Sequence, residues 1–260
     1  MSTVLCVPQW QGSAAETARF LADGARRTAQ LVPADRVVTV EVPEFDGPMA
    51  GGVRAADALV AVQRATEATL RTVDDFVLTA GGDCAVDLVP ISAAAERYGA
   101  DLKLLWIDAN PDVYGPGDPF SGAFHAMVVR TLLGDGPPAL TPRTVLTPEQ
   151  VVFAGVRVVD DCEQEYLREK NLRVNELEAA VEGLKGPLYV HVDLDVLDPA
   201  EFASVGYSYP AGPSVARVLE LIEGLTGVVG AAITEHAPRA RNPREEEVVR
   251  ALGTALLSFA

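Results

Sequence analysis

The sequence predicts an α/β protein whose mostly parallel sheet is covered by helices on both faces. Short apolar runs rich in β-branched residues alternate with longer segments whose apolar residues recur at helical spacing. This alternation is typical of parallel strands joined by crossover helices. The 260 residues, 48% of them hydrophobic, suffice for one large domain. We therefore expect a single three-layer α/β/α domain over residues 1–260, with about eight strands.

The strands are predicted from short apolar runs bounded by turn-forming or acidic residues. The shortest run is expected at an edge of the sheet. The expected strands are Val4–Val7, Val37–Val42, Phe76–Thr79, Leu102–Ile107, Val151–Ala154, Leu172–Val174, Leu188–Val192 and Val228–Ile233.

The helices are predicted from helical spacing of apolar and alanine residues. Ser13 is expected to cap the first helix, and Pro90 to lie in a first turn or at a kink. The expected helices are Ser13–Leu31, Ala55–Thr72, Ala85–Tyr98, Gly122–Leu133, Asp160–Lys170, Glu176–Leu184, Ser214–Leu225 and Arg244–Ser258.

Charge and cysteine usage restrict the partners and the compartment. A net charge of -16 argues against a nucleic-acid partner or an anionic membrane surface. The three cysteines are far apart and form no CxxC pair, which fits a reducing cytoplasm better than a disulfide scaffold. No basic segment precedes an apolar core at the N-terminus, and no apolar run has the length of a membrane span. We expect a cytoplasmic protein.

Polar side chains follow four of the predicted strands. The run LKLLWIDANPD places Asp108, Asn110 and Asp112 at the end of a buried strand. Parallel sheets bind ligands beyond the carboxyl ends of their strands, and oxygen ligands at alternate positions can converge on one cation. Two unpatterned segments, Gly115–Ser121 and Pro199–Pro213, follow polar strand ends and are expected to form the rim of a substrate site.

The other three clusters contain a thiol and further acids. Cys84 follows a pair of glycines and is expected to begin a helix, whose N-terminus would lower the pKa of the thiol. Asp193 and Asp195 share one face of a strand end, and Glu235 follows the last strand. Each cluster alone also fits a structural role, Cys84 as a small buried residue and Glu235 as a capping or surface acid.

In chain order the clusters are GGDC (81–84), DANPD (108–112), DLDVLDP (193–199) and EHAP (235–238). Together they resemble the GGDH, DAHxD and DxDxxDP stretches and the late glutamate of the ureohydrolase family, the arginases and agmatinases. The segment SGAFH (121–125) resembles the family's SGNxHG stretch. The segment GVR (155–157), with Asp160 and Glu163, is similar to its GxR strand and substrate-binding acids. The resemblance covers nearly the whole chain and implies an arginase-like domain.

The resemblance implies a binuclear manganese site that hydrolyses a C–N bond of a small guanidino substrate. By matched position, Asp108 and Asp193 would contact both metals. The remaining ligands would be Cys84 and Asp112 on the first metal, and Asn110 and Asp195 on the second. In the family, a hydroxide held between the metals attacks the guanidinium carbon.

The resemblance also implies roles for acid and base groups. Asp195 would relay a proton to the leaving amine, Glu235 would pair with the guanidinium, and His125 would be the proton shuttle. The substrate-binding residues would be Ser121, Asp160, Glu163 and Glu235. Structural alternatives are an ordinary hydrogen bond for His125, a helix cap for Asp160 and a first-turn charge for Glu163. His191 is interpreted as structural.

The departures from the family pattern concern the metals and the substrate. Both family histidine ligands are replaced, by Cys84 and Asn110. A thiolate suits zinc or iron better than manganese, and a neutral amide oxygen should weaken the second metal site. More anionic ligands make bound water less acidic, which favours a substrate with a better leaving group, such as a hydroxyguanidine. Ala123 and Tyr114 also put recognition of an arginine-like head group in doubt.

Two other functions stay open. One is a catalytically impaired family member with a binding role, which the loss of both histidines favours and the retained acids oppose. The other is a thiol-dependent amidino enzyme with Cys84 as nucleophile. It is disfavoured because crowded carboxylates raise the pKa of a thiol when no cation is bound. The oligomeric state is open.

Overall fold

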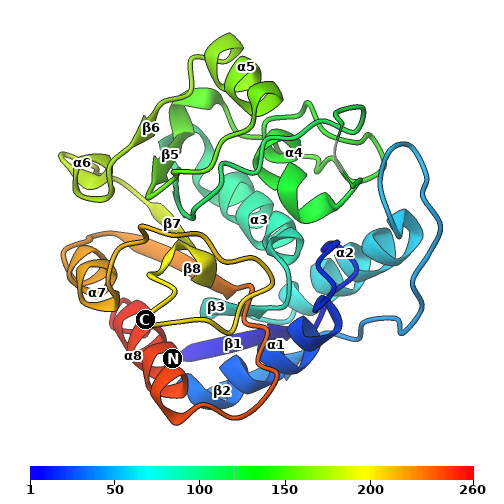
Figure 1. Cartoon of the computed structure of the whole chain (residues 1–260). Helices are drawn as coiled ribbons and strands as arrows, with labels where there is room; N and C mark the ends of the chain where they lie inside the picture. Colours follow the sequence, from blue (N-terminus) through cyan, green and yellow to red (C-terminus); the bar gives the residue numbers. More distant parts are fainter. Residues whose placement is uncertain (120) are drawn as a thin grey trace.

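The computed structural model describes residues 1–119 and 121–260 and confirms the predicted fold class (Figure 1). Its strands are β1 Ser2–Val7, β2 Arg36–Thr39, β3 Phe76–Gly81, β4 Lys103–Ile107, β5 Val151–Ala154, β6 Val174–Asn175, β7 Leu188–Asp193 and β8 Val228–Thr234. They form one 8-stranded sheet in the order β2-β1-β3-β8-β7-β4-β5-β6. Every neighbouring pair is parallel.

The helices form a layer on each face of the sheet. They are α1 Arg19–Leu31, α2 Ala56–Leu70, α3 Leu88–Tyr98, α4 Val128–Leu132, α5 Asp161–Glu169, α6 Leu177–Val181, α7 Val215–Glu223 and α8 Pro243–Leu257. Helices α1, α6, α7 and α8 pack on one face, and α2, α3, α4 and α5 contribute to the core on the other (Figure 1). No helix in the described part of the chain is long and apolar enough to cross a membrane.

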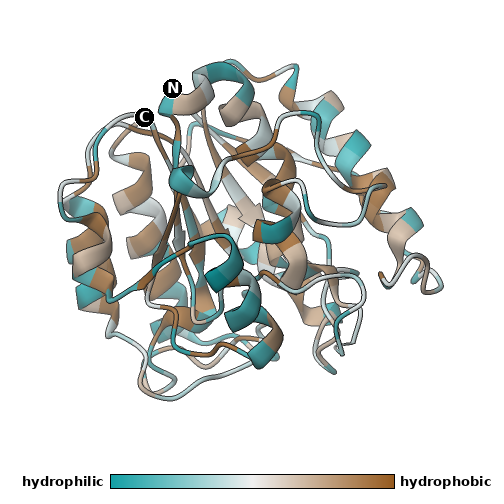
Figure 2. Cartoon of the chain, turned by 90° about the horizontal axis from the view of Figure 1, so that it is seen from above, coloured by the Kyte–Doolittle hydropathy of each residue, from teal (hydrophilic) through white to brown (hydrophobic). Residues whose placement is uncertain are grey.

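The central strands are buried on both faces, and this explains their nearly continuous apolar sequences. All six residues of β7 are buried, with Val190 and Val192 in the core under α7 and α8. Leu104 and Trp106 of β4 face the opposite core, under α3. Figure 2 shows the hydrophobic colours concentrated on the strands and on the inner sides of the helices. A parallel sheet covered in this way has no solvated face that would impose alternation.

Two helices begin later than predicted. Helix α1 starts at Arg19, and Ser13 is not its cap, because the Ser13 hydroxyl accepts a hydrogen bond from Ala15 N (3.3 Å) in a preceding turn. The segment predicted as a helix from Gly122 has a left-handed Gly122 (φ 74°) and then a 3₁₀ turn, Phe124–Met127, before α4. Pro90 lies in the first turn of α3, as expected. Strand β6 is an edge strand, also as expected.

The strand order places the four polar clusters next to one another. Strands β3, β8, β7 and β4 are consecutive in the sheet although their order in the chain is 3, 4, 7, 8. Because all of them are parallel, their carboxyl ends lie at the same edge. That edge carries the candidate site.

Candidate active site

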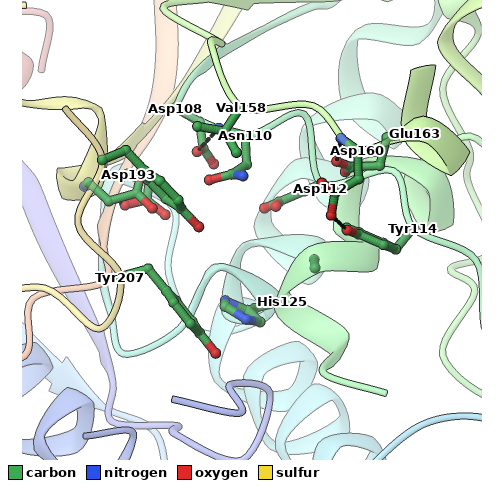
Figure 3. Close-up of a pocket in the computed structure, with 13 residues that line it drawn as sticks. Asp108, Asn110, Asp112, Tyr114, His125, Val158, Asp160, Glu163, Asp193 and Tyr207 are labelled. Carbon is green, nitrogen blue, oxygen red and sulfur yellow. Dashed lines mark hydrogen bonds between the residues drawn. The ribbon is translucent and has the colours of Figure 1, made fainter. Parts of the chain in front are cut away.

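A pocket of about 100 Å³ opens at the carboxyl ends of β4 and β7 (Figure 3). Most of the predicted site residues line it. They are Asp108, Asn110, Asp112, His125, Asp160, Glu163, Asp193 and Asp195. Cys84 and Glu235 lie directly beside this lining, in contact with Asp193 and His125 respectively. Ser121 is exposed and does not line the pocket, and its hydroxyl accepts from Ala123 N (3.3 Å).

The end of β4 fixes Asp108 from two sides. Its carboxylate accepts a hydrogen bond from Asn110 N (2.7 Å) and another from Trp106 Nε1 (3.0 Å). The chain then turns so that Asp112 has a left-handed backbone (φ 52°), and its side chain points into the pocket (Figure 3). A non-glycine residue in this region is strained, and such strain is concentrated at functional sites.

The end of β7 supplies two more carboxylates. Asp193 accepts from Asp195 N (2.7 Å) and from the Cys84 thiol (3.0 Å). Asp195 lies in the single 3₁₀ turn Leu194–Val196 and accepts from Ala109 N (3.3 Å), which connects the ends of β7 and β4. Carboxylate oxygens of Asp108, Asp193 and Asp195 lie within 4.8 Å of one another.

Cys84 is positioned by the turn that follows β3. Gly82 is required there because a Cβ at this position would lie 1.7 Å from the carbonyl oxygen of Gln9. Cys84 opens a 3₁₀ turn, Cys84–Asp87, which Asp83 caps by accepting from Ala85 N (3.0 Å). Burial raises the pKa of the Cys84 thiol well above its usual range, and Asp193 and other nearby acids add to the effect. The predicted lowering by a helix N-terminus is therefore wrong for the metal-free protein, since burial and four acids outweigh one short turn.

Glu235 and His125 form a buried pair at the wall of the pocket. Glu235 has a left-handed backbone (φ 63°), and its Oε1 accepts from Cys84 N (3.2 Å) and lies 3.1 Å from His125 Nδ1. Burial lowers the pKa of His125, but the opposing effect of Glu235 and Asp83 is larger, so the net shift is upward. His125 Nε2 is buried and has no hydrogen-bond partner among the described residues. It can exchange a proton with a molecule in the pocket.

The pocket is electrostatically unbalanced without a cation. Burial, followed by repulsion from neighbouring acids, raises the pKa of Asp108, Asp112 and Asp193 well above the usual range. The pKa of Asp195 rises to about 7, first because of burial and then because of Glu235. No lysine or arginine is among the described residues that line the pocket. Carboxylates and a thiol crowded in this way are a donor set that fits divalent metal ions, which would relieve the repulsion.

The structural alternative for Asp160 and Glu163 is confirmed, and both residues also line the pocket. They form a capping box at the start of α5, in which Glu163 accepts from Asp160 N (3.2 Å). The Glu163 carboxylate also accepts a hydrogen bond from Val113 N (3.3 Å). Burial raises the pKa of Glu163 to about 7. The Tyr114 hydroxyl donates to Asp160 (Figure 3). The acids are thus fixed by backbone and phenol before any substrate binds.

Two tyrosines of the pocket, Tyr207 and Tyr209, had not been assigned from the sequence. They come from Pro199–Pro213, one of the two segments predicted to form the rim. Arg157 holds this segment in place, because its guanidinium donates to the carbonyls of Pro210 (3.0 Å), Tyr209 (3.2 Å) and Asp195 (3.1 Å). The available signal was a pair of tyrosines two positions apart in a loop made mostly of proline, alanine and glycine. The described residues of the other segment, Gly115–Pro119 and Ser121, do not line the pocket, and Phe120 lies outside the described residues.

Comparisons with known proteins agree with this arrangement. A sequence model of the Arginase family matches residues 27–257. An arginase of Staphylococcus aureus is 26% identical over 245 residues, covering 84% of this chain and 80% of that protein. The N(omega)-hydroxy-L-arginine amidinohydrolase of Streptomyces lavendulae is 27% identical over 256 residues, with 92% and 91% covered. The crystal structure of Bacillus cereus arginase superposes with a TM-score of 0.85 at 19% identity, covering 100% of this chain and 98% of that one. The chain belongs to the arginase family.

Proposed function

We propose that this protein is a divalent-metal-dependent hydrolase that cleaves a C–N bond of a guanidino group in a small molecule. The observation that carries the proposal is the cluster of Asp108, Asp112, Asp193 and Asp195 around the Cys84 thiol, buried and held by directed hydrogen bonds. A buried group of this charge is costly unless cations neutralise it. The family membership supports the reaction class.

The metal ligands we propose are those at the family's motif positions. Asp108 and Asp193 would be shared by two cations. Each has an oxygen close to Asp195 and also belongs to a group that contains the Cys84 thiol, which supports this assignment. Cys84 and Asp112 would complete one site, and Asn110 and Asp195 the other. Divalent cations supply Lewis-acid activation of water and a positive field for charge that develops in the reaction. Manganese is the family's metal, and the Cys84 thiolate extends the choice to zinc or iron.

The remaining groups handle the proton and the substrate. His125 lines the pocket and its Nε2 has no partner among the described residues, while Glu235 binds its Nδ1. The pair would shuttle protons between solvent and the site, and Asp195 would pass one to the departing amine. Glu235 also offers negative charge to a guanidinium. Tyr207 and Tyr209 line the pocket, and Arg157 binds the carbonyl of Tyr209. The two rings would restrict access of bulk water.

We propose an N-hydroxyguanidine, such as hydroxyarginine, as the better substrate. The neutral Asn110 and the anionic Cys84 reduce the activation of water that the site can provide, so the reactivity of the guanidino carbon gains in importance. An N-hydroxyguanidine is less basic than a guanidine, so its uncharged, more electrophilic form is more accessible, although the amine that leaves is the same. The Streptomyces lavendulae relative, whose name specifies N(omega)-hydroxy-L-arginine, matches over nine-tenths of both chains. Water adds to the guanidino carbon, the C–N bond to the side chain breaks, and an amine and hydroxyurea result.

The test is a side-by-side assay of the manganese-loaded protein with arginine and hydroxyarginine. We expect ornithine to form faster from hydroxyarginine. Faster turnover of arginine would overturn the substrate proposal but would still support hydrolysis of a guanidino C–N bond. A folded, metal-loaded protein that hydrolyses neither compound, nor agmatine, would instead support a binding role.

The contacts of Cys84 argue against the thiol-dependent alternative. Its Sγ is buried, donates to Asp193, and has a pKa raised by the surrounding acids, so the nucleophilic thiolate is suppressed when no cation is present. Activity that survives exhaustive chelation but is lost in Cys84→Ser would reverse this conclusion.

A further inference from the structure

His191 lies in the layer directly beneath the proposed metal ligands. It is two residues before Asp193 on β7, so both side chains point to the same face of the sheet. In the sheet it is paired with Trp106 of β4 on one side and Ala232 of β8 on the other. His191 is completely buried. It does not line the pocket itself but lies one layer below Asp193, which does.

The ring of His191 is held rigidly in one orientation. Nδ1 lies 2.9 Å from the buried carboxylate of Asp87, whose other oxygen accepts from the Tyr189 hydroxyl (2.5 Å). The ring stacks on the indole of Trp106 at 3.5 Å between centroids, with 3° between the planes. A carboxylate on one ring nitrogen fixes the proton there, so Nε2 keeps its lone pair. This is the arrangement that orients histidines bound to metals.

Nε2 of His191 and Sγ of Cys84 share one neighbour, the Thr234 hydroxyl. A ring nitrogen of His191, Sγ of Cys84 and a carboxylate oxygen of Asp108 lie within 4.8 Å of one another. The Thr234 hydroxyl is 3.3 Å from Nε2, 3.3 Å from Sγ and 3.4 Å from the carbonyl oxygen of Val192. A hydroxyl has one proton to donate, so it cannot satisfy all three acceptors at once. A cation shared by Nε2 and Sγ would leave that proton for the carbonyl.

We infer that His191 Nε2 is a metal ligand, together with Cys84 and Asp108. This inference rests on the proposed metal dependence. The imidazole of His191, on β7, would then bind the metal from beneath the site. It would supply a histidine ligand although Cys84 occupies the position of the histidine in the family motif. Asp193 is in reach as a fourth donor, since its carboxylate is 3.0 Å from Cys84 Sγ. One nitrogen, one sulfur and two oxygens suit zinc, cobalt or iron better than manganese.

Paired variants separate ligation from packing. In His191→Asn, the side-chain amide can still donate to Asp87 from the position of Nδ1, but no donor atom remains in place of Nε2. In His191→Gln, an amide oxygen or nitrogen reaches the position of Nε2 instead. Asp87→Asn keeps the imidazole and changes only its orienting partner. His236→Asn is the matched control, because His236 is also buried but its Nδ1 contacts Thr28 of α1 rather than the acid and thiol cluster.

The probes are Co²⁺ titrated into chelator-treated protein and zinc-edge X-ray absorption of the zinc-loaded wild type. We expect a thiolate-to-cobalt absorption band in the wild type and in His236→Asn, and its loss in Cys84→Ser. Asp87→Asn should weaken cobalt binding by about 10–100-fold, the usual effect of an outer partner. His191→Asn should weaken cobalt binding more than Asp87→Asn does. Circular dichroism of the metal-free variant should match that of the wild type. The zinc spectrum should contain both sulfur and imidazole scattering.

The outcomes separate this inference from the proposed function. Wild-type cobalt affinity and spectrum in a folded His191→Asn would overturn the role of His191 alone. If the histidine variants do not fold, a zinc spectrum with sulfur but without imidazole scattering overturns it equally. His191-dependent metal binding in a protein that hydrolyses no guanidine would support the inference and overturn the function. A wild type that binds neither cobalt, zinc nor manganese would overturn both.

Discussion

At the scale of single residues, the site combines strain, burial and unpaired hydrogen-bonding capacity. Asp112 and Glu235 both have left-handed backbones, a conformation that non-glycine residues adopt only when their surroundings impose it. Glu235 is held by its own N–H bond to the Gly82 carbonyl (2.7 Å) and by two contacts of its carboxylate. The protein therefore holds these acids in fixed positions, and small changes to them should affect activity more than folding.

His125→Asn tests the proton-transfer role of the His125–Glu235 pair. Asn can still donate a hydrogen bond to Glu235 from the position of Nδ1, but it cannot exchange a proton through Nε2. We expect kcat to fall by about 10²–10⁴-fold, the usual contribution of a general acid or base. Steady-state kinetics on hydroxyarginine would measure it, with metal content by elemental analysis as the control. An unchanged kcat would show that the imidazole does not transfer the proton.

At the scale of elements, Arg157 is the main connection between β5, β7 and the tyrosine-bearing loop. It follows the end of β5, and its guanidinium donates to four carbonyls. One belongs to Gly155, and the other three, of Asp195, Tyr209 and Pro210, lie 38 to 53 residues further along the chain. Only a planar guanidinium can direct donors at several acceptors in this way. The residue positions Tyr207 and Tyr209 through the loop, without lining the pocket itself.

Arg157→Lys should therefore loosen the loop while retaining the charge. Each hydrogen bond from a charged donor contributes about 1.5–3 kcal/mol to stability. Losing some of these bonds should lower the free energy of unfolding by part of that amount. We expect a raised KM and faster proteolytic cleavage within residues 199–213, with metal affinity preserved. Limited proteolysis followed by mass spectrometry would locate the cleavage. Equal cleavage rates in the two proteins would mean that the loop is held by other contacts.

His236 is a buried histidine whose protonation should lower the stability of the fold at low pH. It is buried after β8, with Nδ1 3.0 Å from the Thr28 hydroxyl of α1. Burial is the largest cause lowering its pKa from 6.5 to about 4. The unfolded chain binds a proton below about pH 6.5, whereas the folded protein resists it down to about pH 4, so stability decreases as the pH falls through this window.

His236→Asn should reduce this pH dependence. In the wild type, the histidine accounts for a loss of up to about 3 kcal/mol in unfolding free energy between pH 6.5 and pH 4. We expect the difference in unfolding free energy between the wild type and His236→Asn to narrow as the pH falls. Urea unfolding at several pH values would measure it. Parallel stability curves for the two proteins would contradict the buried, neutral histidine.

The elements themselves could largely be predicted from the sequence, because strands buried on both faces leave continuous apolar runs. Strand β5 has the predicted bounds, Val151–Ala154. Strand β6 shares only Val174 with the predicted Leu172–Val174, β2 ends at Thr39 rather than Val42, and the remaining strands differ by one or two residues at their ends. Helix starts were less predictable, since Ser13 has the chemistry of a cap but is used in a turn. The contacts between Cys84, His191 and Thr234 could not be predicted. They depend on β3, β8 and β7 being neighbours, and no local pattern encodes that order.

At the scale of the whole molecule, the strand order and the net charge together set the electrostatics of the candidate site. Segments from residues 84, 108, 193 and 235 converge because β3, β8, β7 and β4 are adjacent and parallel. The net charge of -16 adds a long-range negative field to this local crowding. Such a field attracts divalent cations and a guanidinium, and repels anionic substrates. The folded protein therefore holds mutually repelling acids at one edge of its sheet. Metal binding should relieve this repulsion and stabilise the entire domain.

Removal of bound metal should accordingly destabilise the whole protein. A ligand that binds only the folded state raises the unfolding free energy by about 2.7 kcal/mol when its free concentration is 100 times Kd. We expect the Tm of the chelator-treated protein to be lower and to rise steadily with added Mn²⁺ or Zn²⁺, by a few degrees per kcal/mol for a chain of this size. Calorimetry at several metal concentrations would measure this, with Mg²⁺ as the control, because it retains its water and is poorly matched to a thiolate. A Tm independent of metal would mean that the four aspartates are neutralised by protons, and the hydrolase proposal would lose its main physical support.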